Sequence, residues 1–308
     1  MKKSISIIAL CLVLFSPLAC KKEEETTTTP SLSGLYINTA TPFIAVGDEL
    51  VFNADVSDLY VSDDSELGTV GLYWQVGSKD KDTLTRNVQV QNPPFSYRFN
   101  ETGTYTIYCY AYSDKGYYNA SATTTTRVID PETSLTGLAG ERASGSTYRT
   151  VSLNGLLWLA ENLFEEGGAC YQDSPVVNTV LGRYYTWTQA QTACPAGWRL
   201  PTAAEWDTLG EDAGRLMANA LFLEEKMWPI NIQFEITNET GFNAIPAGYQ
   251  DYNAGYYAQS GYGEYALFWT ADEQDGKGVY RYIYGKSDRI QKGKGDKNTL
   301  ALSVRCVK

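Results

Sequence analysis

The sequence contains no histidine among its 308 residues. This absence excludes Ser-His-Asp and Cys-His catalysis, imidazole ligation of a metal and a histidine pH switch. Methionine is also scarce, with 3 residues, whereas 23 Tyr and 27 Gly favour sheet and loop over helix. A formal net charge of −11 argues against nucleic acid as a partner. We expect a β-rich protein without a cofactor or a resident metal.

The N-terminus has the order of a secretion signal. Lys2 and Lys3 precede an apolar run from Ile5 to Phe15, which is shorter than the ~20 apolar residues that span a bilayer. Ala19 followed by Cys20 resembles a bacterial lipobox, in which a peptidase cleaves before a cysteine that carries lipid. We expect residues 1–19 to be a lipoprotein signal peptide, and a plain secretory signal is the alternative.

The segment after the cleavage site predicts the localisation of the protein. Residues 20–32 are polar and low in complexity, which is typical of a flexible tether. The run Lys21–Glu25 resembles the acidic surface-export signals of some Gram-negative lipoproteins, and a solvated tether is the alternative reading. We expect a protein anchored in the outer membrane through lipid on Cys20 and exposed at the cell surface.

Cysteine is limited to 6 residues, of which Cys11 leaves with the signal and Cys20 carries lipid. The others lie in an oxidising compartment, where cysteines can pair. These four are Cys109, Cys170, Cys194 and Cys306.

Residues 33–131 contain short strand patterns separated by turn signals, which predict an all-β, immunoglobulin-like or PKD-like sandwich. Trp74 stands where such a sandwich keeps a core tryptophan. In the run from Glu101 to Ala111, a Gly-Thr-Tyr sequence resembles a tyrosine corner. The side chains expected on the buried face of this run are Tyr105, Ile107, Cys109 and Ala111. We therefore interpret Cys109 as a buried core thiol.

A turn-rich boundary near Asp130 separates the sandwich from a second domain at residues 140–308. Asn154-Gly155 lies between two apolar segments and predicts a β-hairpin. Thr202 and Glu205 have the spacing of a capping box at the start of a helix. A second short helix is expected over Thr188–Ala193, and Trp206, Leu209 and Ala213 share one face at helical spacing.

A series of motifs runs along this second domain. They are Leu157–Leu163, Gly182–Trp187, Thr192–Pro201, Ala204–Leu209, Thr237–Phe242 with Pro246–Tyr249, and Ser303–Val307. In this order they resemble the motifs of the Fibrobacter-type major paralogous domain. The resemblance implies an α+β fold related to C-type lectins and, more distantly, to formylglycine-generating enzymes. The expected architecture is an immunoglobulin-like sandwich followed by a lectin-like domain.

Within this domain we expect Cys194 and Cys306 to form a disulfide between the helical half and the last strand. In the chain-entropy description such a long loop closure contributes about 4–5 kcal/mol. Copper ligation by the same pair is the alternative that the remote likeness to formylglycine-generating enzymes suggests.

Several carboxylates of the second domain offer the pair that glycoside hydrolysis needs. They are Glu161, Glu205, Asp207, Asp272 and Glu273. Glu205 has a use as a helix cap and Glu161 lies within a family motif, so we expect structural roles and assign no catalytic residue.

Two charged runs have both a functional and a structural reading. The acidic run from Asp55 to Glu66 offers hard oxygen ligands for calcium, but its spacing matches no known loop motif. The lysine-rich run from Lys286 to Lys297 suits contact with an acidic glycan. We expect solvated loops in both cases.

The segment from Tyr249 to Tyr265 is the best candidate for a recognition surface. Its Tyr, Gly, Ser and Asn composition gives large, rigid contact faces at low entropy cost. Its glycines and irregular aromatic spacing predict a loop, although some tyrosines can instead cover the core. The candidate binding residues are Tyr252, Tyr256, Tyr257, Tyr262 and, just beyond the segment, Trp269.

The sequence thus predicts a surface lipoprotein that acts as a non-enzymatic binding or adhesion module for glycan or for a surface protein. A structural component of a surface filament or envelope assembly is the alternative. A carboxylate-based glycan-active enzyme is the third possibility.

Overall fold

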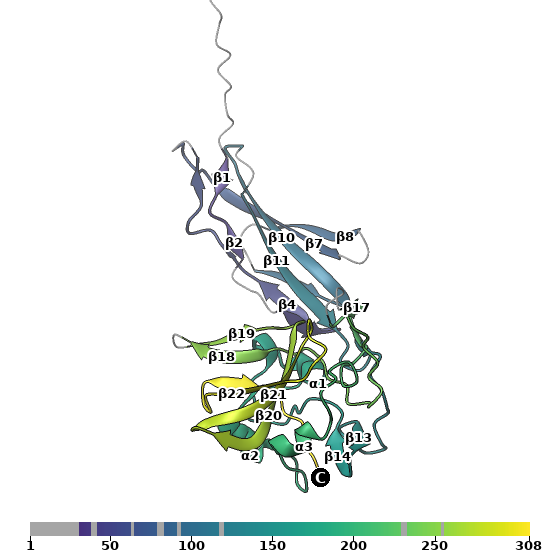
Figure 1. Cartoon of the computed structure of the whole chain (residues 1–308). Coiled ribbons are helices and arrows are strands. Elements are labelled where there is room, and N and C mark those ends of the chain that lie inside the picture. The colour runs from purple at the N-terminus through teal and green to yellow at the C-terminus, as the bar shows by residue number, and fades with distance from the viewer. Residues whose placement is uncertain are drawn as a thin grey trace, which may run out of the picture.

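The computed structural model describes residues 31–37, 42–62, 65–78, 83–90, 94–116, 120–228, 233–253 and 256–308. Two domains follow one another along the chain, a β-sandwich and a C-terminal domain of mixed composition (Figure 1). The expected signal peptide, Cys20 and most of the tether lie outside the described residues. Within these ranges no helix has the length and apolar character to cross a membrane.

The sandwich begins at β1, whose Leu32 is already buried in the core, so the domain starts just before the expected boundary. Its largest sheet has five strands in the order β3-β11-β10-β7-β8, with β3 parallel to β11. The strands are β1 (Leu32–Ser33), β2 (Tyr36–Ile37), β3 (Phe43–Ala45), β4 (Glu49–Phe52), β5 (Ala54–Asp55), β6 (Tyr60–Val61), β7 (Val70–Ser78), β8 (Thr83–Val90), β9 (Phe95–Arg98), β10 (Gly103–Ser113) and β11 (Ala120–Ile129). Most of the domain is therefore sheet, as its alternating sequence predicts.

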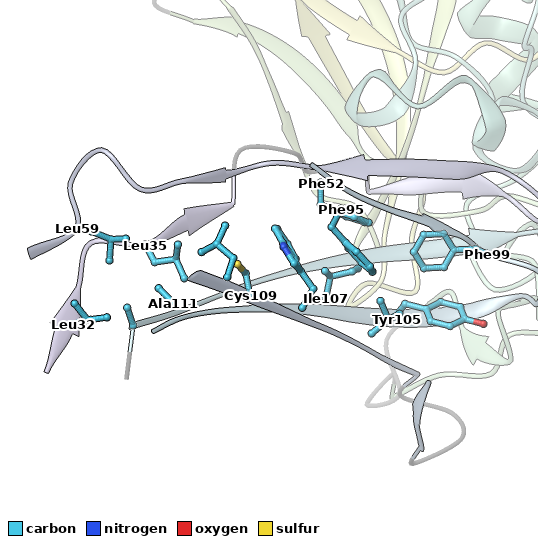
Figure 2. Close-up of a cluster of buried hydrophobic side chains, with 14 of the residues drawn as sticks. Leu32, Leu35, Phe52, Leu59, Phe95, Phe99, Tyr105, Ile107, Cys109 and Ala111 are labelled. Carbon is cyan, nitrogen blue, oxygen red and sulfur yellow. The ribbon is translucent and has the colours of Figure 1, made fainter. Parts of the chain in front are cut away.

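Strand β10 shows why this domain folds as a sandwich. Every second side chain is buried along its whole length, which matches the two-residue period of a strand. Ile107, Cys109 and Trp74 of the neighbouring β7 are fully buried in the core that Figure 2 shows between the layers. Tyr105 donates its hydroxyl hydrogen to the carbonyl oxygen of Glu101 at 3.1 Å, the local bond of a tyrosine corner.

Burial raises the pKa of the Cys109 thiol to about 12, and this cysteine is free. Its interpretation as a core thiol is confirmed.

The C-terminal domain combines short helices with several small sheets. Its elements are β12 (Leu135–Thr136), β13 (Thr150–Leu153), β14 (Leu156–Leu159), the 3-10 turns Tyr171–Asp173 and Pro175–Val177, α1 (Asn178–Leu181), β15 (Tyr185–Thr186), α2 (Trp187–Ala193), α3 (Ala203–Asp207), β16 (Leu221–Phe222), β17 (Glu225–Lys226), β18 (Tyr249–Asn253), β19 (Tyr256–Ser260), β20 (Tyr265–Gln274), β21 (Lys277–Tyr284), β22 (Gln291–Gly295) and β23 (Leu300–Leu302). The two main sheets have the orders β15-β23-β18-β19 and β20-β21-β22.

Local signals in this domain mark its turns and helix starts. The predicted Asn-Gly turn joins β13 and β14, with positive φ of 50° at Asn154 and 84° at Gly155. The capping box of Thr202 and Glu205 is present at the start of α3, and Thr186 forms a second box at α2. Helix α3 ends at Asp207, so Leu209 reaches the shared core from the turn that follows, not from a longer helix.

The two domains share a buried seam. Phe43 of β3 packs against Tyr171 and Phe222 of the C-terminal domain, with ring centroids 5.8 Å apart in both pairs. The side chains of Phe43 and Ile129 belong to the same apolar cluster as Val177 and α1 of the C-terminal domain. This shared core fixes one end of the sandwich against the C-terminal domain, as the neighbourhood of β4 and β17 in Figure 1 indicates.

Candidate binding face

The predicted recognition segment forms a β-hairpin where a loop was expected. Strands β18 and β19 pair antiparallel, with Tyr252 opposite Tyr257. Tyr252 is 45% exposed. Gly255 and the side chains of Tyr256 and Tyr257 lie outside the described part of the chain. The loop prediction was wrong because it considered the segment alone, whereas β18 also pairs with the distant strand β23.

Of the predicted binding residues, Trp269 lies inside the domain and Tyr262 is half-buried. Trp269 is fully buried, and its indole Nε1 donates a hydrogen bond to the carbonyl oxygen of Tyr185 at 2.7 Å. Tyr262 packs against Tyr171 with ring centroids 5.1 Å apart, and burial raises its pKa to about 12. A fully buried ring offers no face to a ligand, so Trp269 is a core residue that packs beneath the sheet.

A group of half-buried tyrosines lies beside Trp269, four on the sheet of β20 and β21 and one at the start of β18 in the neighbouring sheet. We call it the tyrosine face and define it by Tyr249, Tyr265, Tyr280, Tyr282 and Tyr284. The antiparallel register places Tyr265 opposite Tyr284, and Tyr282 and Tyr280 opposite the next residues of β20 on the same side. These side chains therefore share one face, because alternate residues of a strand point the same way.

The rings of this face contact one another. Tyr265 and Tyr284 are stacked with centroids 4.6 Å apart and planes at 13°. Tyr282 lies 6.4 Å from Tyr265 and 5.9 Å from Tyr280. Tyr280 stands edge-on to the buried Trp269 at 5.7 Å, which joins the row to the core.

Glycines allow the rings to lie close to the backbone. A Cβ atom at Gly293 of β22 would stand 2.3 Å from the ring of Tyr280. Gly261, with φ of +70°, leaves room for Tyr265 and for Tyr249 from the end of β18. The face therefore extends from β21 across β20 to β18, on the side where Figure 1 shows the β18–β19 hairpin beside this sheet.

The hydrogen bonds of their hydroxyl groups distinguish the tyrosines of this face from those of the core. In the core, Tyr148 donates to the Glu165 carboxylate at 2.9 Å, and Tyr184 and Tyr185 donate to backbone carbonyls at 2.5 Å. None of the five hydroxyls of the tyrosine face forms a hydrogen bond with any described residue, and none is among the buried atoms without a partner. These hydroxyls are therefore available to solvent or to a ligand.

The charge around the face is low. Partial burial is the main cause of the raised pKa of Tyr265 and of Tyr280, and neighbouring tyrosines add to it. The ionic group that acts on the pKa of Tyr265 is the carboxylate of Glu264. No lysine or arginine contributes to either shift. The face is thus aromatic and polar at its edge, and no lysine or arginine acts on Tyr265 or Tyr280.

The lysines in and next to strand β22 form ion pairs with carboxylates. Lys292 pairs with Asp207 at 2.9 Å, and Lys294 pairs with Asp275. Lys297 pairs with Glu273 and lies over the ring of Trp187. Part of the lysine-rich run, expected as a solvated loop, forms strand β22, and these ion pairs reduce its attraction for an acidic glycan.

The candidate catalytic carboxylates all have partners. Glu161 is buried between Arg142 and Arg149, whose guanidinium groups lie 2.9 and 2.5 Å away, and these partners hold its pKa below the usual value against the opposing effect of burial. Glu205 pairs with Arg199, and this contact lowers its pKa to about 2.

The remaining carboxylates follow the same pattern. Asp207 binds Arg281 at 2.9 Å in addition to Lys292. Asp272 accepts a hydrogen bond from the backbone N–H of Ala203 at 2.5 Å, at the start of α3. Within the described ranges no group of three or more Asp, Glu or Cys side chains has the arrangement of a metal site.

Cys194 and Cys306 form a disulfide with Cα atoms 5.9 Å apart, which confirms the predicted bond. Both sulfurs are bonded to each other, so the pair does not present the thiolates that copper ligation needs. Cys170 is free and partly exposed.

Sequence reasoning missed Tyr280, Tyr282 and Tyr284 as surface candidates. Their spacing in Tyr280-Arg-Tyr-Ile-Tyr284 is a strict alternation, which already predicts three tyrosines on one face of a strand. A second group of half-exposed tyrosines on the sandwich was also missed. There Tyr110 lies 6.1 Å from Tyr73 and 6.3 Å from Tyr108. The Tyr73 hydroxyl accepts a hydrogen bond from Gln75, so this group is less free than the tyrosine face.

Several solved structures resemble part of the chain. The CARDB domain of PF1109 from Pyrococcus furiosus shares 15% identity, with a TM-score of 0.24, over 32% of this chain and 95% of that one. The PKD domain of human KIAA0319 shares 14% identity, with a TM-score of 0.24, over 34% of this chain and 87% of that one. Fibronectin(III)-like modules of Clostridium thermocellum CbhA share 9% identity, with a TM-score of 0.22, over 31% of this chain and 95% of that one. At these values the likeness says nothing about ligand or partner.

No curated protein matches the chain. The family model described as the Fibrobacter succinogenes major domain matches residues 151–308, which is just over half of the sequence. The match covers the helices, the disulfide and the whole tyrosine face. The chain therefore belongs to the Fibrobacter succinogenes major domain family.

Proposed function

We propose that this protein is a lipid-anchored surface module that binds a glycan or a protein without catalysis, and that the tyrosine face is its contact surface. The observation that carries the proposal is the set of five half-exposed rings whose hydroxyls have no partner among the described residues. Aromatic faces with polar edges are enriched at binding surfaces, where rigid rings give contact area at low entropy cost.

The arrangement of the domains suits display from a membrane. The described chain begins at β1, at the end of the sandwich remote from the C-terminal domain (Figure 1). Lipid on Cys20 would thus be attached on the side away from the tyrosine face. The sandwich then acts as a spacer, and the C-terminal domain is the lectin-like binding head.

The environment of the carboxylates supports binding without catalysis. A glycosidase needs one carboxylic acid with a raised pKa beside a second, ionised carboxylate. Glu161, Glu205 and Asp207 instead have lowered pKa values, which their ion pairs with arginine and lysine favour. Such groups stay ionised and engaged with their partners.

Anchoring is tested with Cys20→Ser in the full-length chain. We expect this change to leave unprocessed precursor or to release the protein from the membrane fraction, because lipid is attached to the cysteine thiol. Unchanged processing and fractionation would show that the anchor is not a lipid on Cys20.

Binding is tested with the mature protein on a glycan array and an array of extracellular proteins. We expect a ligand whose signal falls at least about thirtyfold in the Tyr265→Ala/Tyr282→Ala variant, because loss of ~2 kcal/mol or more at one aromatic anchor alone predicts that factor. The matched control is Tyr108→Ala/Tyr110→Ala on the sandwich, which should keep the signal. A ligand lost in the control and retained in the first variant would move the site to the sandwich.

A further inference from the structure

We infer that the tyrosine face binds a neutral glycan chain whose pyranose units carry mainly equatorial hydroxyls, as in a β-linked glucan. This inference rests on the proposed function and specifies its ligand. It follows from four properties of the face: ring contact, free hydroxyls, lack of cations and extent.

The first property is the unbroken row of rings. From Tyr280 through Tyr282 and Tyr265 to Tyr284, successive centroids lie 4.6 to 6.4 Å apart, so each ring adjoins the next. A pyranose with equatorial hydroxyls has faces of axial C–H bonds, which are weakly positive and apolar. Such a face is attracted to the negative face of an aromatic ring.

The second property is the unused hydrogen-bonding capacity at the edge of the row. The five phenol hydroxyls can each donate and accept, and none is engaged with a described residue. Equatorial sugar hydroxyls project from the rim of the ring, where they can meet these groups. Stacking and edge hydrogen bonds can therefore form in one pose.

The third property is charge. The carboxylate of Glu264 acts on Tyr265, and no cation contributes to the shifts of Tyr265 or Tyr280. Lys292 and Lys294 belong to β22 but pair with Asp207 and Asp275. These two lysines are thus engaged and not free to bind an anionic glycan, which a protein of net charge −11 would also repel. A neutral chain is not repelled.

The same observations weigh against a proline-rich peptide. Peptides of that kind dock their prolines into grooves between aromatic side chains. Here Tyr265 and Tyr284 are stacked nearly parallel at 13°, and Tyr282 adjoins Tyr265. The stacked rings close the space that a proline would enter.

The fourth property is the extent of the row, which predicts a dependence on chain length. Because Tyr280, Tyr282, Tyr265 and Tyr284 follow one another at centroid distances of 5.9, 6.4 and 4.6 Å, one sugar ring cannot cover them all. Each further unit should add contact until the row is covered. Affinity should then level off.

The experiment measures binding of the mature protein to soluble probes by isothermal titration calorimetry. The probes are barley mixed-linkage β-glucan, cello-oligosaccharides from disaccharide to hexasaccharide, β-mannan with its axial hydroxyl, polygalacturonate and oligoproline. We expect binding to β-glucan, at least about tenfold weaker binding to β-mannan, and affinity that rises with oligosaccharide length before levelling off. Tyr265→Ala/Tyr282→Ala should weaken β-glucan binding at least about thirtyfold, while Tyr108→Ala/Tyr110→Ala should leave it unchanged.

A second variant keeps the test valid if the alanine variant does not fold. Tyr265→Phe/Tyr282→Phe retains both rings and removes two hydroxyls, so it should fold and lose about fivefold per hydrogen bond. Unchanged affinity for β-glucan in this variant would overturn the role given to the hydroxyls.

The remaining outcomes separate the inference from the function on which it rests. Binding of polygalacturonate or oligoproline, but not β-glucan, with the same tyrosine dependence would overturn the neutral-glycan inference and leave a binding module. Binding of β-glucan that survives both tyrosine substitutions would also overturn it. If, in addition, neither array yields a ligand that depends on the tyrosine face, the proposed function falls as well.

Discussion

At the residue scale, Arg305 holds the centre of the C-terminal domain with a fully buried guanidinium. No described carboxylate forms an ion pair with it, and burial lowers its pKa to about 9, so it stays charged at neutral pH. Its hydrogen-bond acceptors are Asn162 Oδ1 and the carbonyl oxygens of Leu159, Phe242 and Asn243, at 2.7 to 3.1 Å. The rings of Phe242 and Phe268 lie 4.7 and 5.5 Å from the guanidinium carbon. One cation thus joins three distant segments of the chain.

Replacing this cation should be costly. In Arg305→Met the side chain keeps an apolar stem, but four buried oxygen acceptors lose their donor. We expect the free energy of unfolding to fall by about 3–5 kcal/mol, as for a buried charge network that loses one member. Urea unfolding measures this change in the free energy of unfolding. The exposed pair of Arg289 and Glu211 supplies the control Arg289→Met, which should cost less than about 1 kcal/mol. Equal effects in the two variants would show that the buried contacts contribute little.

The carboxyl group of Glu205 should make the stability of the folded protein depend on pH. The hydrogen bond from Arg199 lowers the pKa of this carboxyl from 4.5 to about 2 in the folded protein. Because the folded value is depressed, the pair contributes stability above the unfolded pKa, and this contribution is lost as pH falls toward the folded value. Arg199 is 51% exposed, so solvent screening keeps the contribution below about 1 kcal/mol.

Without this carboxylate, the curve of melting temperature against pH should be flatter at acid pH. In Glu205→Gln the decline in melting temperature between pH 4.5 and about 2 should be smaller than in the unchanged protein. Glu211→Gln, an exposed carboxylate of the same domain, is the control. An identical acid limb in Glu205→Gln and the unchanged protein would contradict the coupling.

At the element scale, the tyrosine face depends on what lies beneath it. Gly293 of β22 is opposite Tyr280 in the sheet, and a Cβ there would stand 2.3 Å from the ring. In Gly293→Ala the ring must move, and it can do so cheaply because it is the far end of a side chain. We therefore expect a nearly unchanged melting temperature, shifted aromatic NMR signals of Tyr280 and a several-fold loss of β-glucan affinity.

The control for this change is Gly77→Ala in β7. There the nearest side-chain atom, on Tyr108, would be 3.8 Å from the new Cβ, which is ordinary contact. Binding should be unaffected. Full affinity in Gly293→Ala together with a displaced Tyr280 ring would show that this tyrosine is not part of the contact.

Elements with a local cause could be predicted from the sequence. The Asn154-Gly155 turn, the Thr202 cap and the alternation of β10 each depend on neighbours in the chain, and all three are present. The β18–β19 hairpin and the burial of Trp269 could not be predicted in this way. Strand β18 is fixed by pairing with β23, and β20 has apolar clusters on both of its faces, so Phe268 and Trp269 are buried on opposite sides of it. The tyrosine face also needs the register of β20 with β21, which no single segment encodes.

At the scale of the whole molecule, the seam holds the C-terminal domain against one end of the sandwich. Phe43 contributes a buried ring from the sandwich to a cluster otherwise formed mainly by the C-terminal domain. Arg127 of β11 lies over the same ring, 5.4 Å from its centroid. Because apolar contacts cross the boundary, unfolding of one domain exposes surface of the other, which couples their stabilities.

Phe43→Ala tests this coupling. The ring packs against Tyr171 and Phe222 across the boundary, so its removal should cost about 3–5 kcal/mol of stability, the range for a buried phenylalanine. Differential scanning calorimetry should then resolve two separate transitions where the unchanged protein has closely overlapping ones. Phe52→Ala, inside the sandwich core, is the control, because it should lower the stability of the sandwich and leave the cross-boundary contacts in place. If Phe43→Ala lowers the melting temperature but keeps the transitions coincident, other contacts hold the domains together. If it separates them while β-glucan affinity is unchanged, the seam orients the binding head and the tyrosine face forms independently of it.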